Sequence, residues 1–212
     1  MKKFWGFLLV IVLMTSCGEY QSLLKSNDYN LVYKKAIEYY NKGDYQRAMN
    51  LLDGVRSVFV GQAKAQNIAY YRAFCSYNMK DYQIASDLFK QFIQTYPESS
   101  FAEECLYMMG FCDYKASPKP RLDQQVTEKA IREFQLYLSR YPYSMRKDKV
   151  NTYMDEMRDK LSYKAYLSAK NYYLREHYKA AVISLQNCLK DYPGSKYREE
   201  IMYMFCLLYT SD

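Results

Sequence analysis

Proline and glycine are scarce in this chain, since its 212 residues include 5 prolines and 7 glycines, while half of all residues are apolar. Such a composition excludes a chain that stays disordered for want of apolar side chains. The length suits one domain or one short array of repeats.

Long runs of one charge are also absent. The formal net charge is +7, but lysine and arginine are spread along the whole length, and the basic clusters inside the chain are the pairs Lys34-Lys35 and Arg146-Lys147. We interpret these residues as solvated helix faces, with a weak attraction to anionic lipid headgroups as the alternative. No recognition motif accompanies the charge, so nucleic acid is not expected as a partner.

The sequence offers little for catalysis. The single histidine, His177, lies in a predicted turn, where it has a structural position. The adjacent acidic pairs Glu103-Glu104 and Asp155-Glu156 point to different helix faces, so neither pair can act as one acid–base couple. A phosphate-binding glycine loop and a nucleophile elbow are both missing. We therefore expect a protein that is not an enzyme and has no cofactor.

Five cysteines follow Cys17 in the sequence, at positions 75, 105, 112, 188 and 206. Cys105 and Cys112 are separated by about 10 Å along one predicted helix, which is too far for a disulfide. Metal binding would need a close cysteine pair or a nearby histidine, and the chain has neither, so no metal site is expected. The cysteines therefore read best as small buried hydrophobic residues.

One apolar run stands at the N-terminus. Residues 4–14 are apolar and follow Lys2 and Lys3, and a helix of that length spans about half of a bilayer core, so residues 1–16 are predicted to be a signal peptide. The sequence Leu-Met-Thr-Ser-Cys at 13–17 resembles a bacterial lipobox, which predicts lipidation of Cys17 and a lipidated tether over 17–28. The next residue is Gly18 and not the aspartate that is linked to retention of lipoproteins in the inner membrane, so the outer membrane is the expected location. An ordinary cleaved signal with an incidental cysteine is the alternative.

Repetition is what the sequence has in abundance. Ala85 is followed by apolar residues at offsets of four, seven and eight, which form one helix face, and by Pro97 at offset twelve. The proline, which lacks an N–H group, ends the helix after Tyr96. The same template returns at Ala130 and Ala181, and more weakly at Ala48.

The residues before each alanine repeat as well. The signature Tyr33, Ala36 and Tyr40 recurs 37 residues later, and again at 107, 110 and 114 and at 166, 169 and 173. Two helical halves and a terminal proline are typical of tetratricopeptide repeats, whose hairpins must stack to bury their apolar faces. The predicted fold class is all-α, an α-solenoid of helical hairpins with about four and a half repeats.

We expect the repeat domain to cover residues 29–212. The repeats are predicted at 29–59, 65–97, 100–142, 147–193 and, in part, 195–212. The third carries a loop insertion at 115–126, and the fourth begins with a long helix that runs from 147 into residues 163–174.

The tyrosines of the signature have two interpretations. Tyr33, Ala36 and Tyr40 share one helix face, so packing between paired helices explains them, with alanine allowing close approach. The alternative is a groove that binds extended peptide through the exposed edges of the tyrosine rings and through asparagine amides. For such a groove the sequence nominates six residues, which are Asn30, Tyr33, Tyr40, Asn67, Tyr70 and Tyr77. Asn41 and Asn78 would line it as well.

These motifs resemble the BamD family, the lipoprotein component of the outer-membrane β-barrel assembly machine. The resemblance rests on the lipobox cysteine Cys17, on GDYQRA at 43–48, FIQTYPES at 92–99 and MGFCDY at 109–114, on the segment 127–144 after the insertion, and on 166–182 after the long helix. The abundance of tyrosine, with 26 copies, suits a Bacteroidetes-type member.

The resemblance implies an outer-membrane protein that faces the periplasm and helps to recruit and fold barrel proteins. In the family, N-terminal repeats are associated with nascent outer-membrane proteins and C-terminal repeats with the periplasmic domains of BamA. The chain departs from the family at its end, where repeat five has one helix at most. We therefore expect a truncated C-terminus that frays after about Met204 and binds BamA weakly.

A second function stays open. A periplasmic tetratricopeptide lipoprotein that holds envelope-division or cell-wall enzymes would share the Tyr-Pro-x-Ser repeats. Such scaffolds usually lack the lipid cysteine and the long helix of the fourth repeat.

Overall fold

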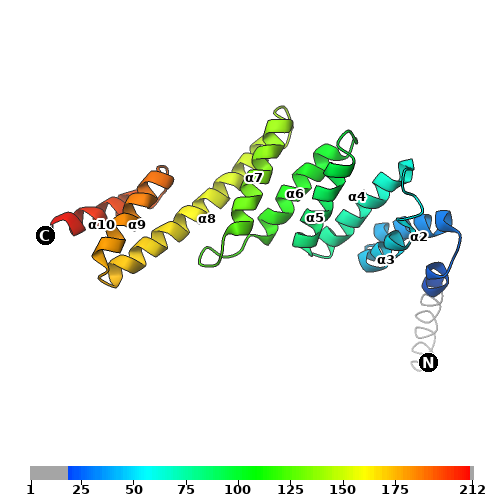
Figure 1. Ribbon diagram of the computed structural model, residues 1–212, viewed down its shortest axis with the longest axis horizontal. Coiled ribbons are helices and arrows are strands. Elements are labelled where there is room, and N and C mark those ends of the chain that lie inside the picture. The colour runs from blue at the N-terminus through cyan, green and yellow to red at the C-terminus, as the bar shows by residue number, and fades with distance from the viewer. Residues whose placement is uncertain (1–18, 211–212) are drawn as a thin grey trace, which may run out of the picture. The chain divides into compact units, whose positions relative to one another are not determined.

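The computed structural model describes residues 19–210 (Figure 1). The predicted signal peptide 1–16 and Cys17 lie outside these residues. Within 19–210 every regular element is a helix, and the helices pair as hairpins, so the predicted all-α, tetratricopeptide-like fold class is confirmed. The chain divides into two compact units, unit 1 up to Met109 and unit 2 from Gly110, and the division falls inside helix α6 (Ala102–Ala116).

Unit 1 contains two complete hairpins. The first is α2 (Tyr29–Asn41) with α3 (Tyr45–Val55), and the second is α4 (Ala63–Asn78) with α5 (Tyr82–Thr95). Each helix packs on the next one along the chain, α2 on α3, α3 on α4 and α4 on α5. The alanines of the repeat signature, at 36, 48, 73 and 85, are fully buried at these contacts, because a larger side chain would separate the helices.

Unit 2 contains α7 (Gln125–Arg140), α8 (Lys147–Leu174), α9 (Tyr178–Asp191) and α10 (Arg198–Thr210). Helix α8 is the long helix, with 28 residues, and it packs on both α7 and α9. The core again holds small residues at the template positions, Ala130, Ala169 and Ala181, beside the large side chains of Phe134 and Leu185.

The hairpin turns share one geometry. Gly43, Lys80 and Glu176 precede the second helix of their repeats and have φ angles of 81°, 68° and 61°. This left-handed conformation closes the first helix, and glycine adopts it without strain. Each is followed by the N-cap residue, Asp44 or Asp81 in unit 1 and His177 in unit 2. The single histidine therefore stands where the other turns have aspartate.

The Tyr-Pro stops are equally regular. Tyr96, Tyr141 and Tyr192 are the C-caps of α5, α7 and α9, with φ and ψ of −130° and 61°, −127° and 66°, and −129° and 65°. These angles lie outside the helical region, as expected for a residue that precedes proline. The backbone N–H of each still donates to the carbonyl four residues earlier.

Residues 19–24 form a helical segment that packs on unit 1. Leu23 is 5% exposed within the core, and the Tyr20 hydroxyl accepts a hydrogen bond of 3.0 Å from Asn50. The guanidinium of Arg47 lies 5.3 Å from the centre of the Tyr20 ring. This packing corrects the expected tether over 17–28, since Tyr20, Leu23 and Leu24 have the i, i+3, i+4 spacing of one helix face.

The loop between α6 and α7 covers residues 117–124, two fewer at each end than the predicted insertion 115–126. Buried Gln124 organises it, because its amide donates to the carbonyls of Lys119 and Leu122 at 2.8 and 3.1 Å. Two lysines of α8 hold the loop from the other side. Lys160 donates to Ser117 Oγ at 2.6 Å and Lys164 donates to the Leu122 carbonyl at 2.9 Å.

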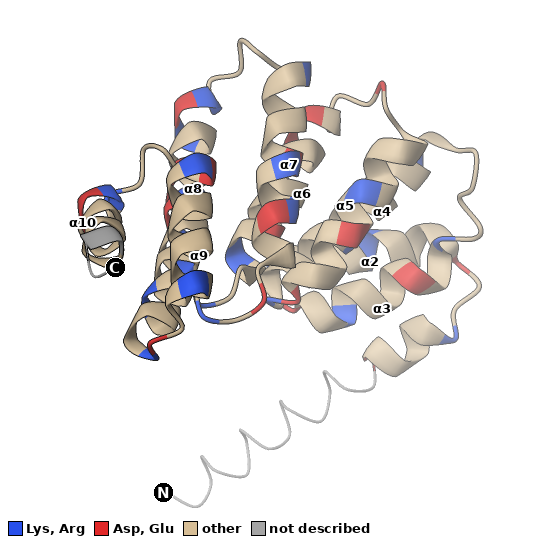
Figure 2. Ribbon diagram, turned by 60° about the vertical axis from the view of Figure 1, so that its left-hand side comes forward, with Lys and Arg blue, Asp and Glu red and all other residues tan. Residues whose placement is uncertain are grey.

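Charged residues of both signs occur on the helices of each unit, as Figure 2 shows. The cysteines at 75, 105, 112 and 188 are buried, as predicted, and Cys206 is exposed. Burial raises the pKa of Cys75 and of Cys105 to about 12, so both thiols stay protonated and unreactive at neutral pH.

Candidate functional site

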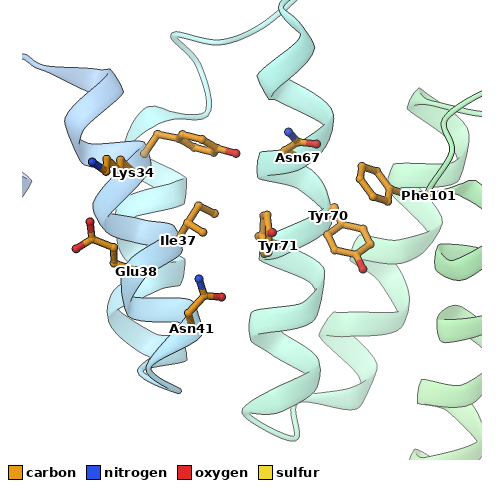
Figure 3. Close-up of a pocket in the computed structure, with 9 residues that line it drawn as sticks. Lys34, Ile37, Glu38, Asn41, Asn67, Tyr70, Tyr71 and Phe101 are labelled. Atoms are coloured by element: carbon orange, nitrogen blue, oxygen red, sulfur yellow. The ribbon is translucent and has the colours of Figure 1, made fainter.

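A groove of about 500 Å³ opens on unit 1 between α2 and α4, and we call it the α2–α4 groove (Figure 3). Helix α2 contributes Tyr33, Lys34, Ile37, Glu38 and Asn41, helix α4 contributes Asn67, Tyr70 and Tyr71, and Phe101 comes from the segment that precedes α6.

Helical spacing brings these side chains to one surface. Tyr33, Ile37 and Asn41 stand four residues apart and therefore lie above one another on α2. Asn67 and Tyr71 have the same spacing on α4. In Figure 3, Ile37 and Asn41 point from α2 toward α4, which presents Tyr71 and Asn67 in return.

Tyr70 gives the groove an aromatic wall. Its ring centre lies 4.6 Å from that of Phe101, and its hydroxyl donates a hydrogen bond of 2.8 Å to Glu104. Burial, followed by the bond to Glu104, raises the pKa of Tyr70 far above its ordinary value, so the hydroxyl remains a donor. Tyr70 is therefore held in place, and its hydroxyl hydrogen is already engaged by Glu104.

Tyr33 stands at one end of the groove, half-buried. Its hydroxyl is hydrogen-bonded to Asn67, and burial raises its pKa. The ammonium of Lys64 lies 5.7 Å from the centre of the Tyr33 ring and donates to Asn30 Oδ1 at 2.6 Å. This bond holds α2 and α4 together beyond the end of the groove.

The rim of the groove carries both charges. Lys34 is exposed, and Glu38 forms an ion pair of 3.0 Å with Lys35. That bond lowers the pKa of Glu38, so the carboxylate stays ionised. A ligand in the groove therefore meets aromatic rings, amides and charges of both signs.

Three of the six nominated residues, Tyr33, Asn67 and Tyr70, line the groove, and the other three do not. Asn30 lies beyond its end, bonded to Lys64. Tyr40 is half-buried, with its ring centre 4.9 Å from that of Tyr71, and burial raises its pKa to about 12.

Tyr77 is also half-buried, with its ring 6.4 Å from Phe74 and 5.9 Å from Tyr82. Packing between paired helices, the other interpretation of the tyrosine signature, thus describes Tyr40 and Tyr77.

Sequence reasoning missed five lining residues, which are Lys34, Ile37, Glu38, Tyr71 and Phe101. Ile37 and Tyr71 could have been found, because each follows a nominated residue by four positions on the same helix. Phe101 could not, since it reaches the groove from outside both helices and no periodicity connects it to them.

The arrangement is suited to binding. Flat tyrosine rings provide contact area at low entropic cost, and amide groups can pair with a peptide backbone. Within residues 19–210, no three histidine, cysteine or acidic side chains gather as ligands for a metal ion. None of the described helices is both long enough and apolar enough to span a bilayer.

A helical-repeat protein with an open groove on the first helices of its hairpins belongs to the class of protein-binding scaffolds. The model of the YfiO family, described as outer membrane lipoproteins, matches residues 25–210. The chain belongs to this family, and it is a BamD-like outer membrane lipoprotein that interacts with other envelope proteins. No curated protein matches the chain.

Proposed function

We propose that this protein is the BamD-type scaffold of a β-barrel assembly machine. It is anchored to the outer membrane through Cys17 and faces the periplasm. Its α2–α4 groove holds extended segments of nascent outer-membrane proteins, while a BamA-type barrel protein binds through its periplasmic domains. Membership of the family of outer membrane lipoproteins supports this role, and the chemistry of the groove carries it.

The groove matches a short stretch of a transmembrane β-strand in length and polarity. From Tyr33 to Asn41 the wall of α2 extends for about 12 Å, the length of about four residues of extended chain. Strands of outer-membrane barrels alternate apolar and polar side chains. Apolar side chains of such a strand would contact Ile37, Tyr70 and Phe101, and its polar side chains and backbone would meet Asn41, Asn67 and the charges of the rim.

A matched pair of isoleucines tests this proposal. Ile37 lines the groove, whereas Ile84 lies on α5 outside it and is 56% exposed. The probe is a fluorescein-labelled ten-residue peptide with the sequence of a transmembrane strand, and its binding is measured by fluorescence anisotropy. Ile37→Ser should weaken binding about tenfold, since it removes apolar contact worth about 1.5 kcal/mol.

The variant Ile84→Ser should bind the peptide like the unchanged protein. Equal affinity of all three proteins would contradict the assignment of the groove. A thermal melt of each variant separates lost binding from lost folding.

The partner is tested by affinity purification from solubilised outer membrane. The proposal expects a β-barrel protein with periplasmic domains to copurify as the main partner. Recovery of envelope-division or cell-wall enzymes in its place would favour the second function, a periplasmic scaffold for those enzymes.

The anchor is tested by metabolic labelling. Cleavage before Cys17 would leave an N-terminus with two or three acyl chains, and such an anchor holds a protein stably on a membrane where one chain does not. An alkyne analogue of palmitate should label the protein, and Cys17→Ala should abolish the label. Labelling that survives the substitution would rule out lipidation at Cys17.

A further inference from the structure

Unit 2 carries a groove of its own along the last three turns of α8, which we call the α8 groove. Its volume is about 610 Å³. Arg121 of the loop 117–124 forms one side, and the remaining lining residues belong to α8: Lys164, Leu167, Ser168, Lys170, Asn171 and Leu174.

The α8 groove is basic. Three of its lining residues are lysine or arginine, and none is aspartate or glutamate. Lys170 is neutralised in part by Glu200, at 2.9 Å. Lys164 and Arg121 have no ion pair with any residue in the described part of the chain. The groove therefore presents two positive charges that no nearby carboxylate offsets.

The hydrogen bonds of the loop fix where these charges stand. The Lys164 ammonium donates to the Leu122 carbonyl at 2.9 Å, which ties the loop to α8 next to Arg121. A carbonyl oxygen neutralises no charge, so Lys164 keeps two N–H groups and its full charge for a ligand. Arg121 is exposed, and its planar guanidinium can take a carboxylate through two parallel hydrogen bonds.

The groove is elongated and mixed in polarity. From Lys164 to Leu174 it follows α8 for about 15 Å, the length of four or five residues of extended chain. Leu167 and Leu174 add apolar contact, and Asn171 adds an amide. This alternation along a line suits a peptide better than a lipid headgroup, which needs one compact cluster of cations.

We propose that the α8 groove binds an extended acidic segment of a partner protein. Aspartate or glutamate side chains of the segment pair with Arg121 and Lys164, and its apolar side chains contact Leu167 and Leu174. This inference does not depend on what occupies the α2–α4 groove, because the two grooves share no residue.

The test uses the full-length lipoprotein in detergent and a fluorescein-labelled ten-residue peptide that contains four glutamates and three leucines. A second peptide, with glutamine in place of each glutamate, is the ligand control. The groove variant is Arg121→Gln with Lys164→Gln, in which the new amide at 164 can still donate to Leu122. The protein control is Arg132→Gln with Lys190→Gln, which removes the same charge from exposed positions on α7 and α9.

Anisotropy should show that the acidic peptide binds and that the groove variant weakens it about tenfold, while the protein control changes affinity less than twofold. Equal losses in the two variants would mean a long-range attraction to net charge, and they would overturn the proposal. So would equal binding of the glutamine peptide.

The remaining occupant, a lipid headgroup, is tested by sedimentation with phosphatidylcholine vesicles that contain or lack phosphatidylglycerol. Vesicle binding that the groove variant abolishes, together with peptide binding that it leaves unchanged, would assign the groove to lipid and overturn the proposal. Unchanged vesicle binding supports the acidic segment.

Discussion

Units 1 and 2 use the same contact to join one hairpin to the next, with different surroundings. In unit 1 the Tyr70 hydroxyl donates to Glu104, and in unit 2 the Tyr166 hydroxyl donates to Glu200, each across 34 residues of sequence. Each tyrosine ring also lies against a second aromatic residue at nearly equal distance, tilted on Phe101 at 4.6 Å in unit 1 and stacked on Tyr197 at 4.7 Å in unit 2.

The difference lies four residues after the tyrosine. Unit 1 has Phe74, whose ring is 4.5 Å from that of Tyr70, and unit 2 has Lys170, which bonds to both Tyr166 and Glu200. In unit 1 the residues around this tyrosine contact are apolar and the groove is aromatic. In unit 2 Lys170 belongs to the contact and adds a cation to the groove.

The grooves themselves use equivalent positions. Ile37 and Asn41 of α2 correspond to Lys170 and Leu174 of α8, which stand 133 residues later in the repeat. One packing register thus places the same helix face at a groove in both units. The repeat therefore determines where a groove forms, and the residues on that helix face determine what the groove binds.

The largest expected effect tests whether the two units share this register. Ala85 in unit 1 and Ala181 in unit 2 occupy the same template position and are fully buried. Leucine at either position should destabilise the protein by about 3 kcal/mol, because the helix pair must separate. Urea unfolding followed by circular dichroism measures the loss.

The control is Lys90→Leu on the exposed side of α5, which should be near neutral. If Lys90→Leu costs as much as Ala85→Leu, the shared register is wrong.

The second prediction concerns Gly110, the one departure from alanine in the tyrosine signature. A Cβ atom at Gly110 would meet Phe134 Cδ1 at 2.8 Å, and Phe134 is fully buried. Gly110→Ala should therefore destabilise the protein by about 1–2 kcal/mol, although alanine favours a helix.

Phe134→Leu should relieve the clash, because the next repeat has alanine at 169 and leucine at 185 in the same template positions. The double variant should lose less stability than the sum of the two single losses. Strict additivity would contradict the proposed contact.

The third prediction concerns two buried carboxyl groups at the contact between α6 and α7 in unit 2. Asp113 and Glu133 are 2% and 8% exposed, and Lys129 lies 2.8 Å from Asp113 and 3.7 Å from Glu133. Burial, followed by the neighbouring Asp113 carboxyl, raises the pKa of Glu133 to about 8, and burial raises the pKa of the adjacent Cys112 thiol.

A carboxyl with a raised pKa binds its proton more tightly in the folded state. The protonated carboxyl therefore stabilises the folded protein. This stabilisation is fully present below pH 4.5, the ordinary pKa of the group, and is lost as the pH rises to about 8. Glu133→Gln should make the free energy of unfolding depend less on pH and should increase it at pH 8 by about 1–2 kcal/mol. The free energy of unfolding measured from pH 5 to pH 9 checks it.

Exposed Glu128 is the control, since its side chain is 55% exposed and Glu128→Gln should leave the slope unchanged. A Glu133→Gln protein with the same pH dependence as the unchanged chain would show that the carboxyl is ionised throughout.

The smallest expected effect is a difference in how salt changes the stability that each tyrosine–glutamate contact provides. Glu104→Gln should cost about 1 kcal/mol, because a charged acceptor for the Tyr70 hydroxyl is lost, and salt should change this little. Glu200→Gln should cost less, since the Glu200 side chain is 48% exposed, and its effect should fade in concentrated salt as the attraction to Lys170 is screened. Equal salt dependence of the two variants would contradict this difference between the Tyr70–Glu104 and Tyr166–Glu200 contacts.

Local sequence patterns predicted most of the fold. The Tyr-Pro stops, the buried alanines and the helix from 147 to 174 follow from helical periodicity and from the chemistry of proline. The docking of Tyr20 and Leu23 could not be predicted, because helical spacing indicates an apolar face but not the core that the face packs against.

The site was half predictable for the same reason. Tyr33, Asn67 and Tyr70 repeat within their helices and could be nominated, but Tyr40 and Tyr77 repeat equally well and do not line the groove. Phe101 and the buried pair Asp113 and Glu133 depend on how neighbouring helices meet. A single-helix pattern carries no information on such contacts.

Photocrosslinking in living cells identifies what the α2–α4 groove holds. A benzoylphenylalanine residue replaces Asn41 in the α2–α4 groove or Lys90 on the exposed side of α5, and crosslinked products are identified by mass spectrometry. We expect crosslinks to newly made outer-membrane barrel proteins at position 41 and few or none at position 90. Equal crosslinking at both positions, or none at 41, would contradict this expectation.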